Sequence, residues 1–339
     1  MPQTDYATLT PSSPPRLRVE GLGVAFRVGG REIPAVEDVG FTLATGETLA
    51  LVGESGCGKS VTALALMRLL PPSARLLGGI AELSGVDLLG LPEKEMRRRR
   101  GQELAMVFQE PMTSFDPVYR LGEQLLEAIY AHEDVSYPVA YNRVEESLAA
   151  VGLPDPAGII RRYPHELSGG MKQRAMIAMA LLENPGLILC DEPTTALDVT
   201  IQAQIMELLA RLRDERGLSL LFITHNLGLV AGFAHRVAVM YAGSIVEVAT
   251  VEDLYSQPSH PYTIGLFASV PRLEGGKGRL VPIPGVVPPL GDFPPGCKFA
   301  NRCRRVAQLC REKRPELADL GNTHAVACHF PGGDDDRTG

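Results

Sequence analysis

The sequence predicts an α/β fold in which strands and helices alternate around a largely parallel sheet. Four short runs consist almost entirely of apolar residues, at positions 48–53, 104–108, 187–190 and 218–224. Runs of this kind are typical of strands buried on both faces of a parallel sheet. Segments with helical periodicity follow the first and third runs, at 59–70 and 201–217, and this alternation favours a layered α/β core.

The composition indicates a folded chain with room for about two domains. Of its 339 residues, 45% are hydrophobic and 22% are charged, values that exclude global disorder. The formal net charge is −7 and tryptophan is absent, so nucleic acid is not the expected partner. No stretch approaches about 18 uncharged apolar residues, and the first residues lack the apolar core of a secretory signal. We therefore expect a chain that stays in the cytoplasm.

A nucleotide-binding loop is predicted between the first apolar run and the helical segment after it. The pattern G-x-x-x-x-G-K-[ST] is matched by Gly53, Glu54, Ser55, Gly56, Cys57, Gly58, Lys59 and Ser60. The glycines let backbone N–H groups surround phosphates at the start of a helix, where the helix dipole is positive. We expect Lys59 to reach the β- and γ-phosphates and the Ser60 hydroxyl to ligate Mg²⁺.

Two further apolar runs end in residues suited to nucleotide hydrolysis. Asp191 and Glu192 directly follow the run at 187–190, so we expect Asp191 to hold Mg²⁺ and Glu192 to activate the attacking water. His225 follows the run at 218–224, and the carboxyl ends of parallel strands share one sheet edge. His225 is therefore expected to hydrogen-bond the γ-phosphate or the water. The expected catalytic residues are Lys59, Glu192 and His225.

The segment LSGGMKQR, from Leu167 to Arg174, completes a set of motifs that resembles the ATP-binding subunits of ABC transporters. It matches the LSGGQ-type signature of that family except at Met171, and it forms a second helix start suited to an anion. The resemblance implies a head-to-tail dimer, in which each ATP lies between the phosphate loop of one subunit and the signature of the other. The signature contacts implied are Ser168, Gly169 and Gly170.

The same resemblance implies roles for four more residues. Phe26 would stack on adenine, and the phosphate contacts would extend to Val61. Gln109 would join Mg²⁺ and signal to the membrane subunit, and Asp198 would make a dimer contact. The implied cofactors are ATP and Mg²⁺.

On this resemblance the chain divides into four parts. We expect a disordered leader at 1–16, an ABC ATPase domain at 17–256, a C-terminal extension at 257–330 and a disordered tail at 331–339. The ATPase domain is expected to be a P-loop NTPase core with an antiparallel β subdomain and a helical insertion at about 111–175. Residues 237–249 are interpreted as a hairpin that turns at Ala242 and Gly243, and the proline-rich segment 281–295 as a stiff connector.

Two cysteines lie in the ATPase domain. Cys57 stands among the backbone donors of the phosphate loop at a helix start, which is expected to lower its pKa and to let alkylation block activity. Cys190 ends an apolar run and is expected to be a small buried hydrophobic residue.

The C-terminal extension contains the other four cysteines, Cys297, Cys303, Cys310 and Cys328. Their spacing alone leaves two interpretations open, a zinc or iron–sulfur site and unligated core thiols. Basic residues between them can offset thiolate charge or form a solvated face; these are Lys298, Arg302, Arg304, Arg305, Arg311, Lys313 and Arg314. The segments HPYT (260–263), IPG (283–285), GCKFANRC and VACH resemble the C-terminal extension of oligopeptide/dipeptide importer ATPases. That resemblance implies a [4Fe–4S] cluster on the four cysteines, with Zn²⁺ as the alternative.

The function that the resemblance implies is ATP hydrolysis coupled to the uptake of dipeptides and oligopeptides. It implies a second, usually non-identical ATPase subunit, two transmembrane permease subunits and an extracytoplasmic peptide-binding protein as partners. These would hold the chain at the cytoplasmic face of the membrane. Three alternatives stay open: a non-transport ABC ATPase acting on nucleic acid or ribosomes, an importer ATPase for another cargo such as nickel, and a redox or metal-sensing module.

Overall fold

The computed structural model describes residues 15–110, 114–195, 197–269, 282–321 and 323–332, and the chain forms two compact units. The first unit combines Met1–Gly90 with Thr224–Gly339, and the second consists of Leu91–Ile223. Of the ends predicted to be disordered, 1–16 and 331–339, residues 1–14 and 333–339 lie outside the described residues. The backbone of Arg16 accepts from the Ser84 N–H at 2.9 Å, and that of Gly332 donates to the Ser259 carbonyl at 2.9 Å.

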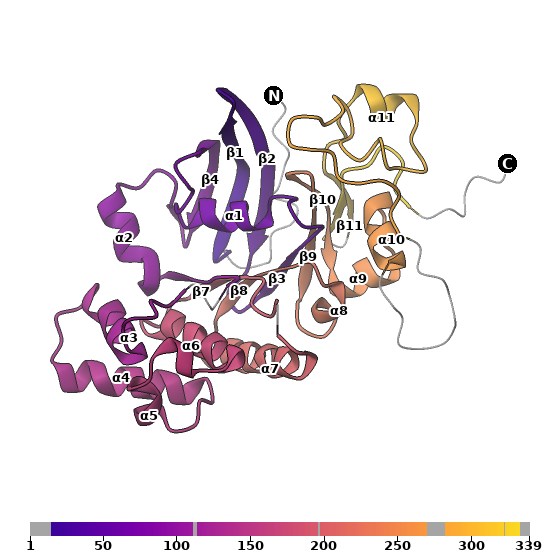
Figure 1. The fold of residues 1–339 in the computed structure, drawn as a ribbon. Coiled ribbons are helices and arrows are strands. Elements are labelled where there is room, and N and C mark those ends of the chain that lie inside the picture. Colours follow the sequence, from indigo (N-terminus) through magenta and orange to yellow (C-terminus); the bar gives the residue numbers. More distant parts are fainter. Residues whose placement is uncertain (1–14, 111–113, 196, 270–281, 322, 333–339) are drawn as a thin grey trace. The chain divides into compact units, whose positions relative to one another are not determined.

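The first unit begins with an antiparallel sheet in the order β2-β1-β4-β5, drawn as indigo and violet arrows in Figure 1. Its strands are β1 (Leu17–Val28), β2 (Arg31–Leu43), β4 (Ala74–Leu83) and β5 (Val86–Asp87). Side chains such as Val19, Val24 and Phe41 are fully buried, because one face of the sheet packs into the core of this unit. The expected antiparallel β subdomain is confirmed.

A second group of strands in the first unit carries the phosphate loop. In the order β11-β12-β10-β9-β3, the strands are β11 (Ala318–Gly321), β12 (His324–Val326), β10 (Ser244–Thr250), β9 (Arg236–Tyr241) and β3 (Thr48–Val52). Strand β3 pairs with β9 in parallel, and β9 with β10 antiparallel. The hairpin between β9 and β10 turns at Ala242 (φ 48°) and Gly243 (φ 83°), a left-handed pair that suits a two-residue hairpin loop. The predicted hairpin is therefore confirmed.

Short helices complete the first unit. They are α1 (Lys59–Leu66), α8 (Leu227–Val230), α9 (Val251–Ser256), α10 (Pro261–Ala268) and α11 (Gln308–Glu312). The described part of the proline-rich segment, 282–295, contains neither helix nor strand.

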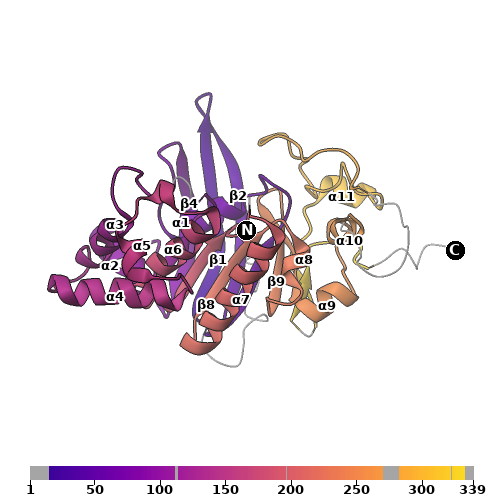
Figure 2. The same ribbon diagram turned by 60° about the horizontal axis from the view of Figure 1, so that its bottom comes forward.

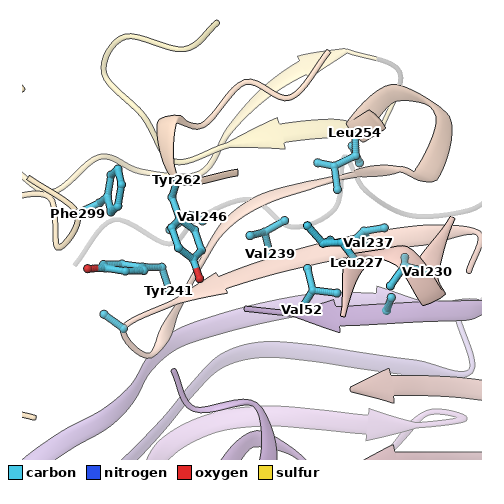
Figure 3. Close-up of a cluster of buried hydrophobic side chains, with 13 residues drawn as sticks. Val52, Leu227, Val230, Val237, Val239, Tyr241, Val246, Leu254, Tyr262 and Phe299 are labelled. Atoms are coloured by element: carbon cyan, nitrogen blue, oxygen red, sulfur yellow. The ribbon is translucent and has the colours of Figure 1, made fainter. Parts of the chain in front are cut away.

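Three aromatic rings join the C-terminal extension to β9 (Figure 3). Tyr241 at the end of β9, Tyr262 on α10 and Phe299 are almost fully buried in one cluster. The ring centroids of Tyr241 and Tyr262 are 4.7 Å apart, and those of Tyr241 and Phe299 are 5.2 Å apart with an edge-on geometry. Such contacts add to the free energy of burial, so the extension shares a core with the strands that carry the phosphate loop.

The second unit contains three parallel strands, of which Figure 2 labels β8, together with several helices. The strands, in the order β8-β7-β6, are β8 (Ser219–Thr224), β7 (Leu187–Asp191) and β6 (Leu104–Val107). All residues of these strands are buried, as their apolar sequences predict.

The helices of the second unit are α2 (Glu93–Gln102), α3 (Leu121–Tyr130), α4 (Tyr137–Ala150), α5 (Pro156–Ile160), the 3₁₀ turn η2 (Pro164–Glu166), α6 (Gly169–Leu181) and α7 (Val199–Arg216). Helix α7 ends at Gly217, whose φ of 64° is left-handed, so the predicted helix end is confirmed. Within the described residues, no helix is long and apolar enough to cross a membrane.

Candidate nucleotide-binding site

The phosphate loop occupies residues 53–58, between strand β3 and helix α1. Gly58 caps the helix with a φ of 107°, in the left-handed region. A Cβ at this position would lie 2.9 Å from Met240 Cε and 3.2 Å from the Ala35 carbonyl oxygen. The tight turn therefore requires glycine, and it directs the chain into the helix whose N-terminal N–H groups favour anions.

Lys59 is folded back over this loop. Its ammonium donates hydrogen bonds to the carbonyl oxygens of Gly53 (2.8 Å) and Glu54 (3.0 Å), and the residue is buried. The positive charge is thus held at the start of α1, as expected for a lysine that binds phosphate. Ser60 and Val61 follow in the first turn, both partly buried.

Cys57 lies in a different environment from the one that the sequence predicts. The residue is only 1% exposed, and burial raises the pKa of its thiol although Lys59 Nζ lies 3.8 Å from the sulfur and acts in the opposite direction. The prediction of a lowered pKa is therefore wrong. Burial outweighs the nearby cation, because an apolar surrounding disfavours the thiolate.

Two residues of the C-terminal extension contact Glu54 inside the phosphate loop. The Arg302 guanidinium donates to both carboxylate oxygens, at 2.6 and 3.1 Å, and the Glu54 backbone N–H donates to the Tyr262 hydroxyl at 2.9 Å. The hydrogen bond to Glu54 raises the pKa of Arg302, although burial acts against this. Sequence reasoning did not assign either residue to the site. The available signals were the carboxylate within the phosphate loop and an arginine between two cysteines.

In the second unit, Glu192 follows β7 and lies within reach of Gln109. Gln109 Nε2 donates to Glu192 Oε2 at 3.3 Å, and the Thr195 hydroxyl donates to the same oxygen at 2.9 Å. Glu192 is buried and has a φ of 45°, in the left-handed region that a non-glycine residue rarely occupies. Strain of this kind is common where a side chain is held for function. The structure therefore brings together two of the predicted site residues, which follow β6 and β7.

Asp191 and Cys190 end strand β7. Asp191 is buried, and its carboxylate oxygens are hard ligands of the kind that Mg²⁺ prefers. Cys190 is fully buried, and burial raises the pKa of its thiol to about 12. The prediction of a small buried hydrophobic residue at Cys190 is confirmed.

Ser168 and Asp198 each cap a helix of the second unit. The Ser168 hydroxyl accepts from the Met171 N–H at 3.3 Å at the start of α6, and the Asp198 carboxylate accepts from the Ile201 N–H at 3.0 Å at the start of α7. Both residues are exposed, so the ends of both helices face solvent in this unit.

Phe26 and His225 are the remaining predicted site residues. Phe26 is half-buried on β1, opposite Ile33 of β2 and Ala74 of β4. His225 is exposed and directly follows β8. The predicted residues are thus shared between the two units: Phe26, the phosphate loop and His225 belong to the first, and Gln109, Ser168, Asp191, Glu192 and Asp198 to the second.

The four cysteines of the extension line one small cavity, together with residues such as His260 and Phe299. Burial raises the pKa of Cys297 to about 11 and also raises those of Cys303 and Cys328. No group of three or more His, Cys, Asp or Glu side chains in the described part of the chain is arranged to hold a metal ion. The ligand chemistry suits iron or zinc, but the arrangement does not fit a bound metal, and the [4Fe–4S] prediction is not confirmed.

Three basic residues of the extension pair with carboxylates. Lys298 Nζ lies 2.8 Å from Glu37 Oε1, and Arg314 Nη1 lies 2.9 Å from Glu37 Oε2. Arg302 pairs with Glu54. Burial raises the pKa of Glu37, but the hydrogen bond and charge of Lys298, with those of Arg314, outweigh it and lower the pKa overall. Lys298 and Arg302 therefore do not form a solvated basic face, since their side chains are only 10% and 4% exposed. Arg314 is exposed, and the charge of Arg305 acts to lower the pKa of Cys303 and of Cys328, as expected for a cation that offsets thiolate charge.

Two family models match the chain. The model described as "ABC transporter" matches residues 36–195, which contain the phosphate loop, the signature and the Asp191–Glu192 pair. The model described as "Oligopeptide/dipeptide transporter, C-terminal region" matches residues 246–310, which contain Tyr262 and Arg302.

Relatives and solved structures agree with these matches. The chain is 48% identical to the dipeptide transport ATP-binding protein DppD of Bacillus subtilis, over 92% of this chain and 93% of that protein. It is also 48% identical to the oligopeptide transport ATP-binding protein OppD of Mycobacterium tuberculosis, over 93% of this chain and 52% of that protein. A solved dimeric ATP-binding cassette, in a post-hydrolysis state with ADP and Pi, superposes with a TM-score of 0.62 at 26% identity; the match covers 69% of this chain and 98% of that one. The chain therefore belongs to the ABC transporter ATP-binding subunits of the oligopeptide/dipeptide importer family.

Proposed function

We propose that this chain hydrolyses Mg·ATP to drive the uptake of dipeptides or oligopeptides through a membrane complex. The observation that carries the proposal is the phosphate loop, with Lys59 held over it at the start of α1 by two loop carbonyls. The chain also carries the C-terminal region of oligopeptide/dipeptide transporters, which favours peptides as cargo.

The first unit supplies the groups that bind the nucleotide. Backbone N–H groups of residues 55–60 and the Lys59 ammonium neutralise phosphate charge, Phe26 stacks on the adenine, and Ser60 contributes its hydroxyl oxygen to Mg²⁺. When bound, Mg²⁺ neutralises charge that develops on the phosphate oxygens during transfer. His225 hydrogen-bonds the γ-phosphate or the attacking water.

The second unit supplies the carboxylates for hydrolysis. Glu192 accepts a proton from the attacking water, and Asp191 contributes an oxygen to the Mg²⁺ shell. The hydrogen bonds from Gln109 and Thr195 keep the Glu192 carboxylate in one orientation. Gln109 contacts this carboxylate directly, so a movement of Gln109 changes the position of the base. In this proposal a permease subunit moves Gln109 and thereby controls hydrolysis.

A second copy or a related ATPase subunit completes each nucleotide site. In this proposal Ser168, Gly169 and Gly170 contact the ATP held by the partner subunit, and Asp198 lies at the dimer contact. The exposed start of α6 supports this, because its N–H groups and the positive end of its dipole are open to an anion.

Peptide importers of this family work with permease subunits and a substrate-binding protein. We propose two permeases, an extracytoplasmic peptide-binding protein and a non-identical second ATPase subunit for this chain. The permeases would hold it at the cytoplasmic face of the membrane.

We also propose that the four cysteines of the extension bind a [4Fe–4S] cluster after local rearrangement. Their shared cavity supports this, because four soft ligands already border one space. Protein purified anaerobically should contain iron and sulfide in equal amounts and be brown. A colourless preparation with stoichiometric zinc would replace the cluster by Zn²⁺, and one without either metal would reject the proposal.

The function is tested with the chain co-expressed with its membrane partners and reconstituted into vesicles. Dipeptides and oligopeptides should stimulate ATP turnover when the binding protein is present. Stimulation by nickel alone would reject peptide cargo, whereas stimulation by RNA or DNA without membrane partners would support the non-transport alternative.

A further inference from the structure

We propose that Arg302 is a positioning residue for ATP, which acts through Glu54. Its guanidinium holds the Glu54 carboxylate and cancels a negative charge that otherwise repels the phosphates. The inference rests on the proposed function, because it assigns the C-terminal extension a direct part in ATP binding by the phosphate loop.

The geometry of the pair is bidentate and fixed from several sides. Arg302 Nη1 and Nη2 donate to different oxygens of Glu54, at 2.6 and 3.1 Å, and Arg302 Nε donates to the Pro284 carbonyl at 2.9 Å. The guanidinium carbon lies 5.8 Å from the ring centroid of Tyr241. The Arg302 side chain is 4% exposed and that of Glu54 is 31% exposed. Paired planar contacts of this kind hold a carboxylate in one orientation.

The Glu54 carboxylate lies in the phosphate loop, so its negative charge bears on phosphate binding. Glu54 directly follows Gly53 in the loop whose backbone N–H groups are expected to bind a polyanion. A carboxylate in that loop repels phosphate unless a cation offsets it. The ammonium of Lys59 contacts the Glu54 carbonyl oxygen rather than its carboxylate, so Arg302 is the cation on the carboxylate itself.

A second contact fixes the backbone of the same residue. The Glu54 N–H donates to the hydroxyl of Tyr262, whose ring is buried against Tyr241 and Phe299. Tyr262 and Arg302 both belong to the extension, and Arg302 stands directly before Cys303. The extension thus determines both the orientation and the effective charge of the phosphate loop at Glu54.

Variants of the full-length chain test the charge argument. Arg302→Ala should raise the KM for ATP and the Kd for Mg·ATP by about tenfold, with kcat at saturating ATP little changed. Arg302→Lys keeps the charge without the bidentate geometry and should give an intermediate Kd. Adding Glu54→Gln to Arg302→Ala should restore most of the affinity, because both charges of the pair are then absent.

Arg304→Ala is the matched control, since Arg304 is an exposed arginine of the same segment. Thermal unfolding of every variant separates lost binding from lost folding. If Arg302→Ala does not fold, two other variants are compared: Arg302→Lys alone, and the double variant Arg302→Lys with Glu54→Gln. The double variant should have the lower Kd for Mg·ATP.

The outcomes separate this inference from the proposed function. Failure of the wild-type chain to bind ATP would contradict the proposed function. Tight wild-type binding with an unchanged Kd in Arg302→Ala would overturn the role of Arg302. A weakened variant that Glu54→Gln does not rescue would also overturn it, because the contact would then be structural only.

Discussion

Glu247 of β10 and His324 of β12 form a buried pair, with 2.8 Å between Glu247 Oε1 and His324 Nε2. The Glu247 side chain is fully buried and also accepts the backbone N–H groups of Ser259 (2.7 Å) and His260 (2.9 Å). A single carboxylate therefore joins β10, β12 and the start of α10, and it holds the extension on the strand group that carries the phosphate loop.

We predict that Glu247→Ala destabilises the first unit by about 3 kcal/mol, because three donors lose their buried acceptor. Urea denaturation gives the change in free energy of unfolding, and limited proteolysis should cut first within 257–330. Glu252→Ala on the exposed side of α9 is the control and should change stability by less than about 0.5 kcal/mol. Equal stability of the two variants would contradict the role of Glu247.

His260 is predicted to make stability depend on pH. Burial lowers its pKa to about 3, and its Nδ1 accepts the Tyr262 N–H at 3.0 Å. The unfolded chain takes up this proton near pH 6.5 while the folded chain does not, so stability is complete above about pH 6.5 and falls as the pH decreases toward 3. The loss has a slope of about 1.4 kcal/mol per pH unit.

The measurement is urea denaturation at pH 5, 6 and 7. His260→Asn keeps an acceptor for the Tyr262 N–H but does not titrate. The free energy of unfolding of this variant should therefore change less steeply with pH, because about one proton fewer is taken up on unfolding. His165→Asn, at an exposed position of the second unit, should keep the wild-type slope. Identical slopes for His260→Asn and the wild-type chain would show that His260 titrates normally.

Cys57 is predicted to react slowly with thiol reagents in the folded protein. Its burial and raised pKa leave little accessible thiolate at pH 7. Brief labelling with iodoacetamide, followed by peptide mass spectrometry, should leave Cys57 largely unmodified in the native chain. Labelling in urea should modify it. Rapid labelling of Cys57 in the native chain would contradict its burial.

Glu192→Gln is predicted to keep ATP binding and to lose hydrolysis by about 10²- to 10⁴-fold, because the amide cannot accept a proton from water. Steady-state turnover and equilibrium binding of Mg·ATP measure the two effects separately. Glu207→Gln, at an exposed position of α7, should retain both. Wild-type turnover in Glu192→Gln would exclude Glu192 as the base.

The strand positions followed from local patterns. The run at 187–190 predicts β7 to within one residue, and the hairpin at 237–249 turns at the two residues that the sequence indicates. Helix α4 lies within the helical insertion expected at about 111–175, but that prediction did not give its bounds. The helix begins at Tyr137, and Pro138 at its second position suits a helix start.

The partners of charged groups did not follow from local patterns. Arg302 stands in a basic segment beside cysteines, and its partner Glu54 lies 248 positions earlier in the chain. The pKa of Cys57 was predicted in the wrong direction for the same reason. Neighbouring donors and Lys59 are visible in the sequence, whereas the burial that outweighs them depends on how the chain packs.

By itself, the sequence determined the phosphate loop, the apolar strands around it, the signature segment and the resemblance to peptide importer ATPases. These features depend on residues close together along the chain, whose spacing and periodicity set the local backbone structure. The tertiary structure alone decided that the C-terminal extension contacts Glu54, that Cys57 is buried and that Glu247 accepts three donors. These depend on segments far apart in sequence, which only the packed core brings within hydrogen-bond distance.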